Sequence, residues 1–346
     1  MCVCVCGYSL VVDIKVMNYS TFVSLNNLFV AWGEFRRGKK NKVDVQLFER
    51  NLEDNLFQLH HELKYKTYRH GSYESFYVND PKRRHIHKAS VRDRVVHHLL
   101  YIYLYQRFNQ HFIYDSYSCR LEKGTHKAVD RLEIFTRRVS KNYTKNCWVL
   151  HLDIKKFFAS VDHSMLKSFL TMGIDNVDIL WLLEEVIDSF NASEGKGIPL
   201  GNLTSQVFAN IYMDDFDQYI KHKLQIKYYI RYADDFIIVS DKKELLISYI
   251  DAISDFLESN LKLALHPKKI TIRRLTWGID FLGYIVLPHY RLPRTKTKRR
   301  IFTKLDEKIG IPSFNQSLQS YLGYLGHANT YGLKQRIKNR IWFSTK

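Results

Sequence analysis

Two adjacent aspartates, Asp234 and Asp235, lie between two apolar runs of the sequence, 228–232 and 236–239. Such runs are typical of strands, so the pair is predicted at the tip of a β-hairpin. Side-by-side carboxylates repel one another, which raises the pKa of one of them unless a cation neutralises the pair. A hard divalent ion prefers oxygen ligands and would serve here. An exposed turn is the alternative, but the flanking runs are too hydrophobic for a surface loop.

A third carboxylate, Asp153, lies in another apolar run, residues 148–154, which is also typical of a strand. If the two strands are neighbours, Asp153 joins Asp234 and Asp235 as a metal ligand. Two ions held by such a set can activate a 3′-hydroxyl and stabilise a departing pyrophosphate. The sequence therefore predicts a site for hard divalent ions with the residues that nucleotidyl transfer requires.

A second pair of aspartates, Asp214 and Asp215, looks similar on paper because it also follows a tyrosine and one further residue. Between positions 205 and 224, however, apolar residues recur at helical spacing: Val207, Phe208, Ile211, Tyr212, Phe216 and Tyr219. This spacing places the second pair on the solvated face of a helix. We therefore expect neither residue to bind metal.

The elements that must position the three carboxylates follow from the same patterns. Residues 93–110 are predicted as a largely buried helix, 243–260 as an amphipathic helix, and 279–287 as a strand or hairpin. Helices come first along the chain, then a mixed core of strands and helices, then a basic helical tail. This order predicts an α+β fold without internal repeats.

The composition narrows the class of protein. The chain has 346 residues, 45% of them hydrophobic, and 53 Lys and Arg against 35 Asp and Glu give a net charge of +18. That hydrophobic content excludes a disordered protein. No apolar run approaches the roughly 18 residues of a membrane span, so no membrane association is expected. The charge is typical of a nucleic-acid-binding protein.

Most of the excess charge lies near the carboxyl-terminal end. From Arg291 onward, thirteen Lys and Arg face two acidic residues, so this segment carries +11 of the +18. Aromatic residues are interleaved with the basic ones, which suits a folded module that tracks a phosphate backbone. A shorter cluster at 36–42 holds five positive charges and has a solvated loop as its alternative.

The cysteines predict neither a disulfide framework nor a zinc site. Cys2, Cys4 and Cys6 alternate with valine, without the spacing of a zinc knuckle, and Cys119 and Cys147 lie far away. We therefore expect a reducing, cytoplasmic location. Residues 1–16 lack the basic start and long apolar core of a signal peptide. We interpret them as an upstream mis-start or a dispensable extension.

The aspartate motifs resemble those of reverse transcriptases. Tyr232-Ala-Asp-Asp resembles the family's catalytic box, and residues 151–162 resemble its first-aspartate motif. Further segments follow in the family's order over roughly residues 80–290, and they begin at Ser90, Arg120, Gly197, Leu265 and Phe281. The resemblance implies a right-hand polymerase with fingers, a palm of antiparallel sheet with packed helices, and a short helical thumb. It also implies magnesium at the palm, and we expect two Mg²⁺ ions per site, with Mn²⁺ as a substitute. The implied partners are template RNA, primer, RNA–DNA hybrid and deoxynucleoside triphosphates.

The resemblance assigns roles to the matching residues. The catalytic carboxylates are Asp153, Asp234 and Asp235, and the Ile154 carbonyl is a further metal ligand. Phe158 resembles the steric gate that excludes a ribonucleotide 2′-OH. A core phenylalanine is the alternative, a place that we expect Phe157 to fill.

The remaining assignments concern nucleotide and nucleic acid. The residues implied at the incoming nucleotide are Arg92 and Arg120, with Lys123 assisting, and Leu200, Gln206 and Lys268. For the basic ones, a contact with the backbone or with RNA is the alternative. The residues implied as a primer grip are Phe281, Leu282, Gly283 and Tyr284. The basic residues expected to bind the template–primer backbone are Arg291, Arg294, Lys296, Lys298, Arg299 and Arg300.

The segment from Leu200 to Gln206 indicates the subtype. Group II intron enzymes usually carry Pro-Gln-Gly followed by Ser-Pro, whereas this chain has Pro-Leu-Gly, with Gln206 in place of the second proline. That pattern resembles the reverse transcriptases of diversity-generating retroelements, which implies error-prone cDNA copied from a template-repeat RNA and a small basic accessory variability protein as partner. A retron-like or defence-associated reverse transcriptase is one alternative. A non-catalytic RNA-binding splicing factor is the other.

These patterns predict four regions. Residues 1–16 are the extension, and 17–147 form the amino-terminal region and fingers. Residues 148–287 form the palm, with an inserted fingers segment at about 175–204. Residues 288–346 form a basic helical thumb.

Overall fold

The computed structural model describes residues 18–79 and 82–344. The extension predicted at residues 1–16, with its three cysteines, lies outside the described residues. The chain forms two compact units that are interleaved in sequence. The first unit comprises Met1–Glu122, Ile154–Gln225 and Ile253–His266, and the second comprises Lys123–Asp153, Ile226–Ala252 and Pro267–Lys346.

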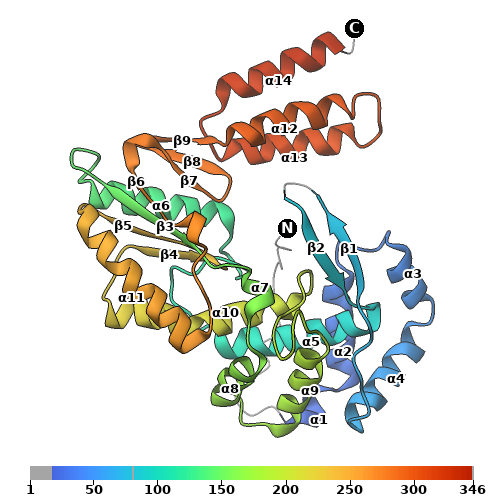
Figure 1. Ribbon diagram of the computed structural model, residues 1–346. Coiled ribbons are helices and arrows are strands. Elements are labelled where there is room, and N and C mark those ends of the chain that lie inside the picture. The colour runs from blue at the N-terminus through green and yellow to red at the C-terminus, as the bar shows by residue number, and fades with distance from the viewer. Residues whose placement is uncertain (1–17, 80–81, 345–346) are drawn as a thin grey trace. The chain divides into compact units, whose positions relative to one another are not determined.

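The first unit is mainly helical (Figure 1). Its helices are α1 (Tyr19–Phe22), α2 (Leu25–Arg36), α3 (Val43–Arg50), α4 (Leu52–Lys64), α5 (Val91–Phe108), α7 (Phe157–Ser160), α8 (His163–Gly173), α9 (Val177–Asp188) and α10 (Leu203–Gln218). A π-helical turn, η2 (Tyr219–Lys223), continues α10. A hairpin of β1 (Glu74–Val78) and β2 (Arg84–Lys88) completes the unit.

Helix α5 is the centre of this unit. Ser90 caps its amino terminus by accepting a hydrogen bond from the Asp93 amide. Twelve of its eighteen residues are buried, and α2 and α10 pack against it. A helix with apolar residues on all sides is stable only when it is covered all round. The predicted buried helix at 93–110 is therefore confirmed, with its start two residues earlier.

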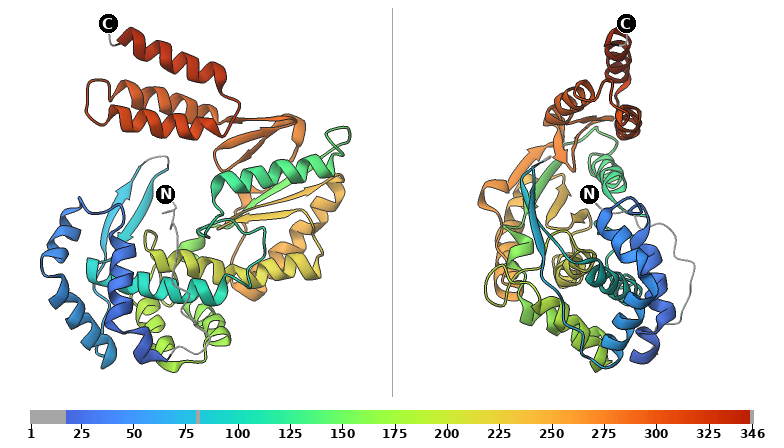
Figure 2. Two further views of the ribbon diagram at one scale, coloured as in Figure 1. Left: turned by 180° about the vertical axis from the view of Figure 1, so that it is seen from behind. Right: turned by 90° about the vertical axis from the view of Figure 1, so that its right-hand side faces the viewer.

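The second unit contains a four-stranded antiparallel sheet in the order β4-β5-β3-β6. These strands are β3 (Trp148–Asp153), β4 (Tyr229–Tyr232), β5 (Asp235–Ser240) and β6 (Thr271–Arg274). Helix α6 (Thr125–Val139) packs against β4 and β5 and covers one face of the sheet (Figure 2). The apolar runs at 148–154 and 228–239 are thus neighbouring strands, as the sequence predicted.

Helix α11 (Lys243–Leu261) follows the sheet's second strand and passes from the second unit into the first. It matches the predicted amphipathic helix at 243–260. Short 3₁₀ turns, η3 (Pro267–Lys269) and η4 (Leu275–Trp277), flank β6. The first of these turns lies beside the end of β3.

A second antiparallel sheet joins β7 (Ile279–Phe281), β8 (Tyr284–Leu287) and β9 (Tyr290–Pro293). Leu282 and Gly283 connect its first two strands, both with positive φ, 48° and 97°. Two such residues in a row form the turn that matches the twist of a tight hairpin. The prediction of a strand or hairpin at 279–287 is confirmed as a hairpin.

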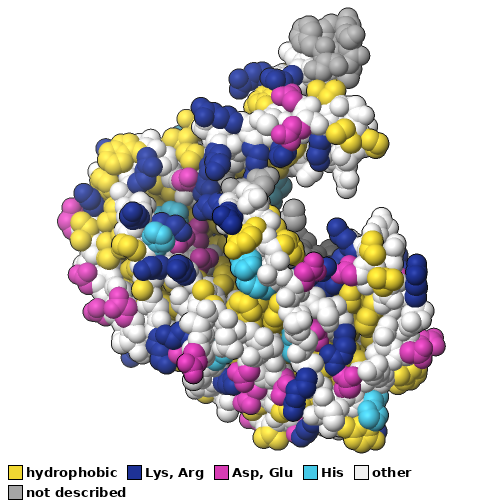
Figure 3. All heavy atoms as spheres, turned by 45° about the vertical axis from the view of Figure 1, so that its right-hand side comes forward, with side chains coloured by type: hydrophobic (Ala, Val, Ile, Leu, Met, Phe, Trp, Pro, Cys, Tyr) yellow, Lys and Arg dark blue, Asp and Glu magenta, His cyan; other side chains and the backbone are white. Residues whose placement is uncertain are grey.

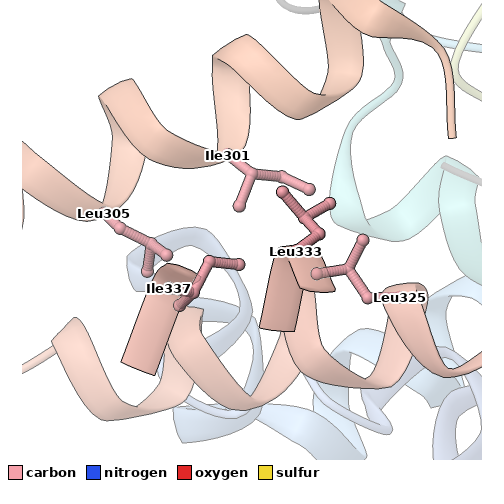
Figure 4. Packing of buried hydrophobic residues seen from close by; sticks show 5 residues of the cluster. All are labelled: Ile301, Leu305, Leu325, Leu333 and Ile337. Atoms are coloured by element: carbon pink, nitrogen blue, oxygen red, sulfur yellow. The ribbon is translucent and has the colours of Figure 1, made fainter. Parts of the chain in front are cut away.

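Three helices end the described chain, α12 (Thr295–Asp306), α13 (Phe314–Gly326) and α14 (Tyr331–Ser344). They share a small hydrophobic core in which the buried side chains point toward one another (Figure 4): Ile301, Leu305, Leu325, Leu333 and Ile337. The basic side chains of α12 lie outside this core. None of the helices in the described ranges is long and apolar enough to cross a membrane.

Candidate active site

The three predicted carboxylates meet at one end of the four-stranded sheet, within the second unit. Asp153 ends β3 and lies directly opposite Asp235, the first residue of β5. Tyr232 pairs with Asp235 across the hairpin, so Ala233 and Asp234 form the two-residue turn between β4 and β5. Strand pairing thus brings together two segments that are some eighty residues apart in sequence.

The electrostatics of Asp234 show how close the carboxylates are. Burial, followed by the negative charges of Asp153 and Asp235, raises the pKa of Asp234 from 3.8 to about 6. Like charges held together disfavour simultaneous ionisation in this way. The positive charge of Lys269 works in the opposite direction. The site therefore favours any cation that approaches it.

Two basic side chains lie against these carboxylates, and sequence reasoning did not find either. Lys269 Nζ donates to Asp153 Oδ1 at 2.7 Å. His151 Nε2 is in hydrogen-bond contact with Asp235 Oδ1. Burial works to lower the pKa of His151, but the bond to Asp235 and its charge outweigh burial, so the pKa is raised. A signal existed for His151, because residues 151 and 153 of a strand share one face.

A buried arginine supports the turn that carries Asp234. Ala233 has a left-handed backbone, with φ at 56°, which is costly for a residue with a side chain. Arg231 on β4 is fully buried, and its guanidinium donates to the Ala233 carbonyl at 3.2 Å. This contact helps to hold the strained turn in place. Sequence reasoning did not find this contact between Arg231 and Ala233, because Arg231 stands in an otherwise apolar run.

The donor set suits a hard divalent ion. Three carboxylates, with the carbonyl of Ile154 next to Asp153 in the chain, offer only oxygen ligands, which Mg²⁺ prefers. Over residues 18–79 and 82–344, no three His, Cys, Asp or Glu side chains are arranged as a ready-made metal site. Lys269 forms an ion pair with Asp153, and His151 is hydrogen-bonded to Asp235. The residues fit Mg²⁺ in chemistry, and the contacts with Lys269 and His151 each engage the Oδ1 oxygen of one carboxylate.

The second aspartate pair lies in helix α10 of the first unit, as predicted. Asp215 is exposed, and Asp214 is half-buried and accepts a hydrogen bond from Gln218 at 3.3 Å, one helical turn away. Tyr212, which precedes the pair, points into the core, where its hydroxyl donates to the Leu261 carbonyl at 2.7 Å. The pair has the setting of an ordinary helix surface.

The two phenylalanines that follow Asp153 differ in burial, and the role of Phe158 at the sugar stays a prediction. Phe157 is buried, with 1% of its surface exposed, whereas Phe158 is half-buried, and the two rings meet edge to face. The Phe158 carbonyl accepts a hydrogen bond from the Ile198 amide at 2.7 Å. This bond ties Phe158 to the segment that leads to Leu200.

The two arginines assigned to the triphosphate are both engaged within the first unit. Arg92 pairs with Glu62 and Asp93 and lies over the Tyr68 ring. Arg120 donates to Asn109 and to the carbonyls of Ile113 and Ser116, at 2.6–3.2 Å. A phosphate would have to compete with these contacts. Their role at the triphosphate stays a prediction.

Three further predicted residues have distinct settings. Leu200 and Gln206 are half-buried in the first unit, at the loop before α10 and in its first turn. Lys268 is exposed in η3 of the second unit. The lysine that reaches Asp153 is its neighbour Lys269. The roles of Leu200, Gln206 and Lys268 at the nucleotide stay predictions.

The predicted primer grip forms the β7–β8 turn. Phe281 and Tyr284 are buried, and the Tyr284 ring stacks on Tyr324 of α13 with centroids 5.0 Å apart. The Tyr324 hydroxyl donates to the Gly283 carbonyl at 3.0 Å. The turn is therefore fixed to the helices that follow it.

The basic residues after position 290 fall into two groups. Arg291 pairs with Asp130 and Glu133 of α6, and Arg294 pairs with Asp280 of β7, so both join elements of the second unit. Lys296, Lys298 and Arg299 lie on α12, without an ion pair to the described residues. Lys and Arg side chains are frequent on the part of the surface formed by these helices (Figure 3). Binding of the phosphate backbone by these residues, and by Arg300 on the same helix, stays a prediction.

Comparison with solved structures defines the fold class. The structure of apo telomerase from Candida tropicalis, truncated from its C-terminal domain, matches with a TM-score of 0.50 at 14% identity, over 65% of this chain and 55% of that one. The mixed helices and antiparallel sheets are those of a right-hand polymerase. The predicted α+β polymerase fold is confirmed.

The sequence comparison defines the family. Residues 79–286, more than half of the chain, match the family model described as reverse transcriptase (RNA-dependent DNA polymerase). The chain therefore belongs to the reverse transcriptase family.

Two curated proteins of known sequence are similar to this chain over part of their length. Protein YkfC of Escherichia coli is 25% identical over 241 residues, 59% of this chain and 63% of that protein. The group II intron-encoded protein LtrA of Lactococcus lactis is 20% identical over 319 residues, 72% of this chain and 51% of LtrA. The chain thus spans less than two thirds of the length of these relatives.

Proposed function

We propose that this protein is an RNA-directed DNA polymerase that makes error-prone cDNA from a template-repeat RNA for targeted gene diversification. Family membership and the carboxylates at the sheet edge support the polymerase activity. The half-buried Leu200, in the loop where group II intron enzymes usually carry glutamine, carries the proposal of error-prone copying.

Asp153, Asp234 and Asp235 are the proposed catalytic residues. With the Ile154 carbonyl, they would hold two Mg²⁺ ions, which supply a more nucleophilic primer 3′-hydroxyl and charge stabilisation of the leaving pyrophosphate. The raised pKa of Asp234 means that this carboxylate ionises most readily when positive charge is near. Arg231 keeps the turn, and with it Asp234, at the end of β4.

Phe158 is proposed as the wall beside the sugar of the incoming nucleotide. Phe158 is half-buried, whereas Phe157 is buried in the core. A ribonucleotide differs by one hydroxyl, which a rigid aromatic wall excludes by contact. The product is then DNA, even though the template is RNA.

Leu200 is proposed to lower copying fidelity. The resemblance places a glutamine here in related polymerases, near the nascent base pair, where its amide can form a hydrogen bond. Leucine has no donor or acceptor, so only shape distinguishes right from wrong pairs. One hydrogen bond is worth about 0.5–1.5 kcal/mol, which corresponds to a roughly two- to tenfold relaxation. A mutator that copies most positions correctly needs a change of this modest size.

The experiment is to sequence cDNA made by the wild type and by Leu200→Gln on one RNA template. We expect an active variant with about two- to tenfold fewer misincorporations, most clearly opposite template adenine. Equal error rates would mean that Leu200 packs beneath the fingers and that infidelity, if present, arises elsewhere.

The partners follow from this function. They are template RNA, a primer, the RNA–DNA hybrid and deoxynucleoside triphosphates, with a small basic accessory variability protein in the same complex. The competing functions are a retron-like or defence-associated reverse transcriptase and a non-catalytic splicing factor. Paired template and variable repeats in the DNA flanking the gene would support the proposal over the first. Magnesium-dependent nucleotide incorporation would support it over the second.

A further inference from the structure

The loop that carries Leu200 is bound to the end of strand β2 by three hydrogen bonds. The His87 amide donates to the Leu200 carbonyl at 2.9 Å. The Asn202 side chain makes the other two bonds: its Nδ2 donates to the His87 carbonyl at 2.8 Å, and its Oδ1 accepts from the Ala89 amide at 3.4 Å. The nitrogen and the oxygen of the Asn202 side chain thus both bond to the backbone between His87 and Ala89.

The burial of Asn202 makes this bridge specific. Only 2% of its surface is exposed, so water cannot replace the two protein partners. A buried amide that loses a partner bears the full desolvation cost of the unpaired group. The two partners also determine which end of the amide is oxygen, because one is an N–H and the other a carbonyl.

Gly201 shows how tightly the loop passes β2. Its φ is +121°, a conformation that side chains rarely adopt, and a Cβ at this position would lie 2.8 Å from Ile86 Cγ2. Between the two bonded residues, the loop therefore passes close to the Ile86 side chain and the His87 backbone.

The other end of the loop is held separately. Thr204, in the first turn of α10, is buried, and its hydroxyl lies 2.6 Å from His97 Nδ1 of α5. Leu200 thus lies between a fixed helix start and the β1–β2 hairpin. Side chains of β1 are exposed along its whole length, so the hairpin is covered less than α5 and α10 are.

We propose that Asn202 is a positioning residue that couples the β1–β2 hairpin to the nucleotide site. It does so by fixing the place of Leu200 relative to His87 and Ala89. The hairpin and the 200–202 loop move as one body, so the depth of Leu200 beside the incoming nucleotide follows the hairpin. This inference rests on the proposed function, because the contact of Leu200 with the nascent pair belongs to it.

The test compares Asn202→Ala and Asn202→Asp with the wild type in single-nucleotide addition on a primed RNA. Alanine removes both bonds, and aspartate keeps the acceptor but sets a carboxylate oxygen against the His87 carbonyl. For both, we expect KM for the nucleotide to rise about five- to thirtyfold while kcat stays within about twofold. We also expect faster hydrogen exchange at the His87 amide, whose acceptor is the Leu200 carbonyl.

The matched control is Asn55→Ala in the same unit. The Asn55 amide also donates to a backbone carbonyl, that of Phe48, at 3.0 Å, but at the junction of α3 and α4. We expect this variant to leave KM, kcat and the exchange of the His87 amide unchanged. A purely structural effect of losing an asparagine would appear in both sets of variants.

A double-mutant cycle asks whether Asn202 acts through Leu200. Combining Asn202→Ala with Leu200→Gln should give a change in misincorporation that differs from the sum of the single changes, because the two residues share one loop. If the wild type is active and KM for the nucleotide is unchanged in both Asn202 variants, the proposed coupling is wrong. Strictly additive changes in the misincorporation rate would also overturn it. Either result leaves the polymerase proposal standing. A wild type that incorporates no nucleotide overturns both.

Discussion

The two Asp-Asp pairs of this chain follow nearly the same residues, yet their structures differ. Asp214 and Asp215 lie on helix α10, where one is exposed and the other bonds to a glutamine one turn away. Asp234 and Asp235 lie at a strained hairpin turn, opposite Asp153. The first pair lies on the surface of a helix, with one carboxylate exposed and one half-buried, and in the second pair the sheet adds a third carboxylate. Strand pairing, rather than the dipeptide, creates the site.

Neutralising one aspartate of each pair tests whether only the hairpin pair is needed for nucleotide incorporation, and this test has the largest expected effect. Asp234→Asn removes a charge from the proposed metal-binding set and should lower the rate of nucleotide incorporation by about a thousandfold. Asp214→Asn should leave that rate largely intact. Rates measured on one primed RNA decide the matter, and an essential Asp214 beside a dispensable Asp234 would refute the assignment of the site.

The aromatic pair after Asp153 extends the comparison to sugar selection. Phe158→Ala should open space for a 2′-hydroxyl and raise ribonucleotide over deoxyribonucleotide incorporation by about 10- to 200-fold, the range of one packing contact. Phe169→Ala is the control, because that ring is also half-buried but packs on Tyr212 of the core. Unchanged sugar selectivity in an active Phe158→Ala enzyme would remove Phe158 from the nucleotide pocket.

The pKa of Asp234 gives a test of the crowded carboxylates without catalysis. Because this pKa is raised from 3.8 to about 6, the folded chain keeps a proton that the unfolded chain loses in that range. In metal-free buffer, the free energy of unfolding should therefore fall as pH rises from about 4 to 6, by up to about 1.4 kcal/mol per pH unit. Asp234→Asn should lack this component and be more stable than the wild type above pH 6. If the free energy of unfolding depends on pH in the same way for the wild type and Asp234→Asn, the raised pKa of Asp234 is contradicted.

The basic residues near the carboxyl-terminal end offer a smaller version of the same contrast. Arg291 and Arg294 are paired within the fold, whereas the α12 residues Lys298, Arg299 and Arg300 belong to the predicted backbone contact. Neutralising these three together should flatten the salt dependence of RNA binding by about two to three units of log–log slope.

The control for that measurement is a triple neutralisation at the end of α6. Arg138, Lys141 and Lys145 are exposed in the same unit, and we expect no change of slope there. An unchanged slope in the α12 variant would favour a solvated helix face, or docking of an acidic protein, over backbone binding.

Much of the fold could be predicted from the sequence, because it depends on local periodicity. The apolar run ending near Asp153, the hairpin around Asp234 and the helix carrying Asp214 each have a clear period, and each is found where expected. The contacts that complete the site depend on register instead. His151 meets Asp235 only because Asp153 and Asp235 are opposed, and Lys269 reaches Asp153 only because η3 lies beside β3.

The role of Asn202 escaped prediction for a related reason. Its amide is bonded to residues more than a hundred positions earlier, and the unpredicted β1–β2 hairpin supplies those partners. The hairpin itself has short strands that expose most of their side chains, so hydrophobic alternation gives little sign of it. Periodicity reports burial, and neither of these strands is buried.

The most direct test of the central claim is primer extension on an RNA template with a titration of Mg²⁺. We expect the wild type to extend the primer with deoxynucleotides only when Mg²⁺ or Mn²⁺ is present. We also expect Asp153→Asn, which removes the carboxylate on strand β3, to lose this activity while it still binds the primed RNA. Extension that survives removal of divalent ions, or that persists in Asp153→Asn, would contradict the claim that these three carboxylates form the polymerase centre.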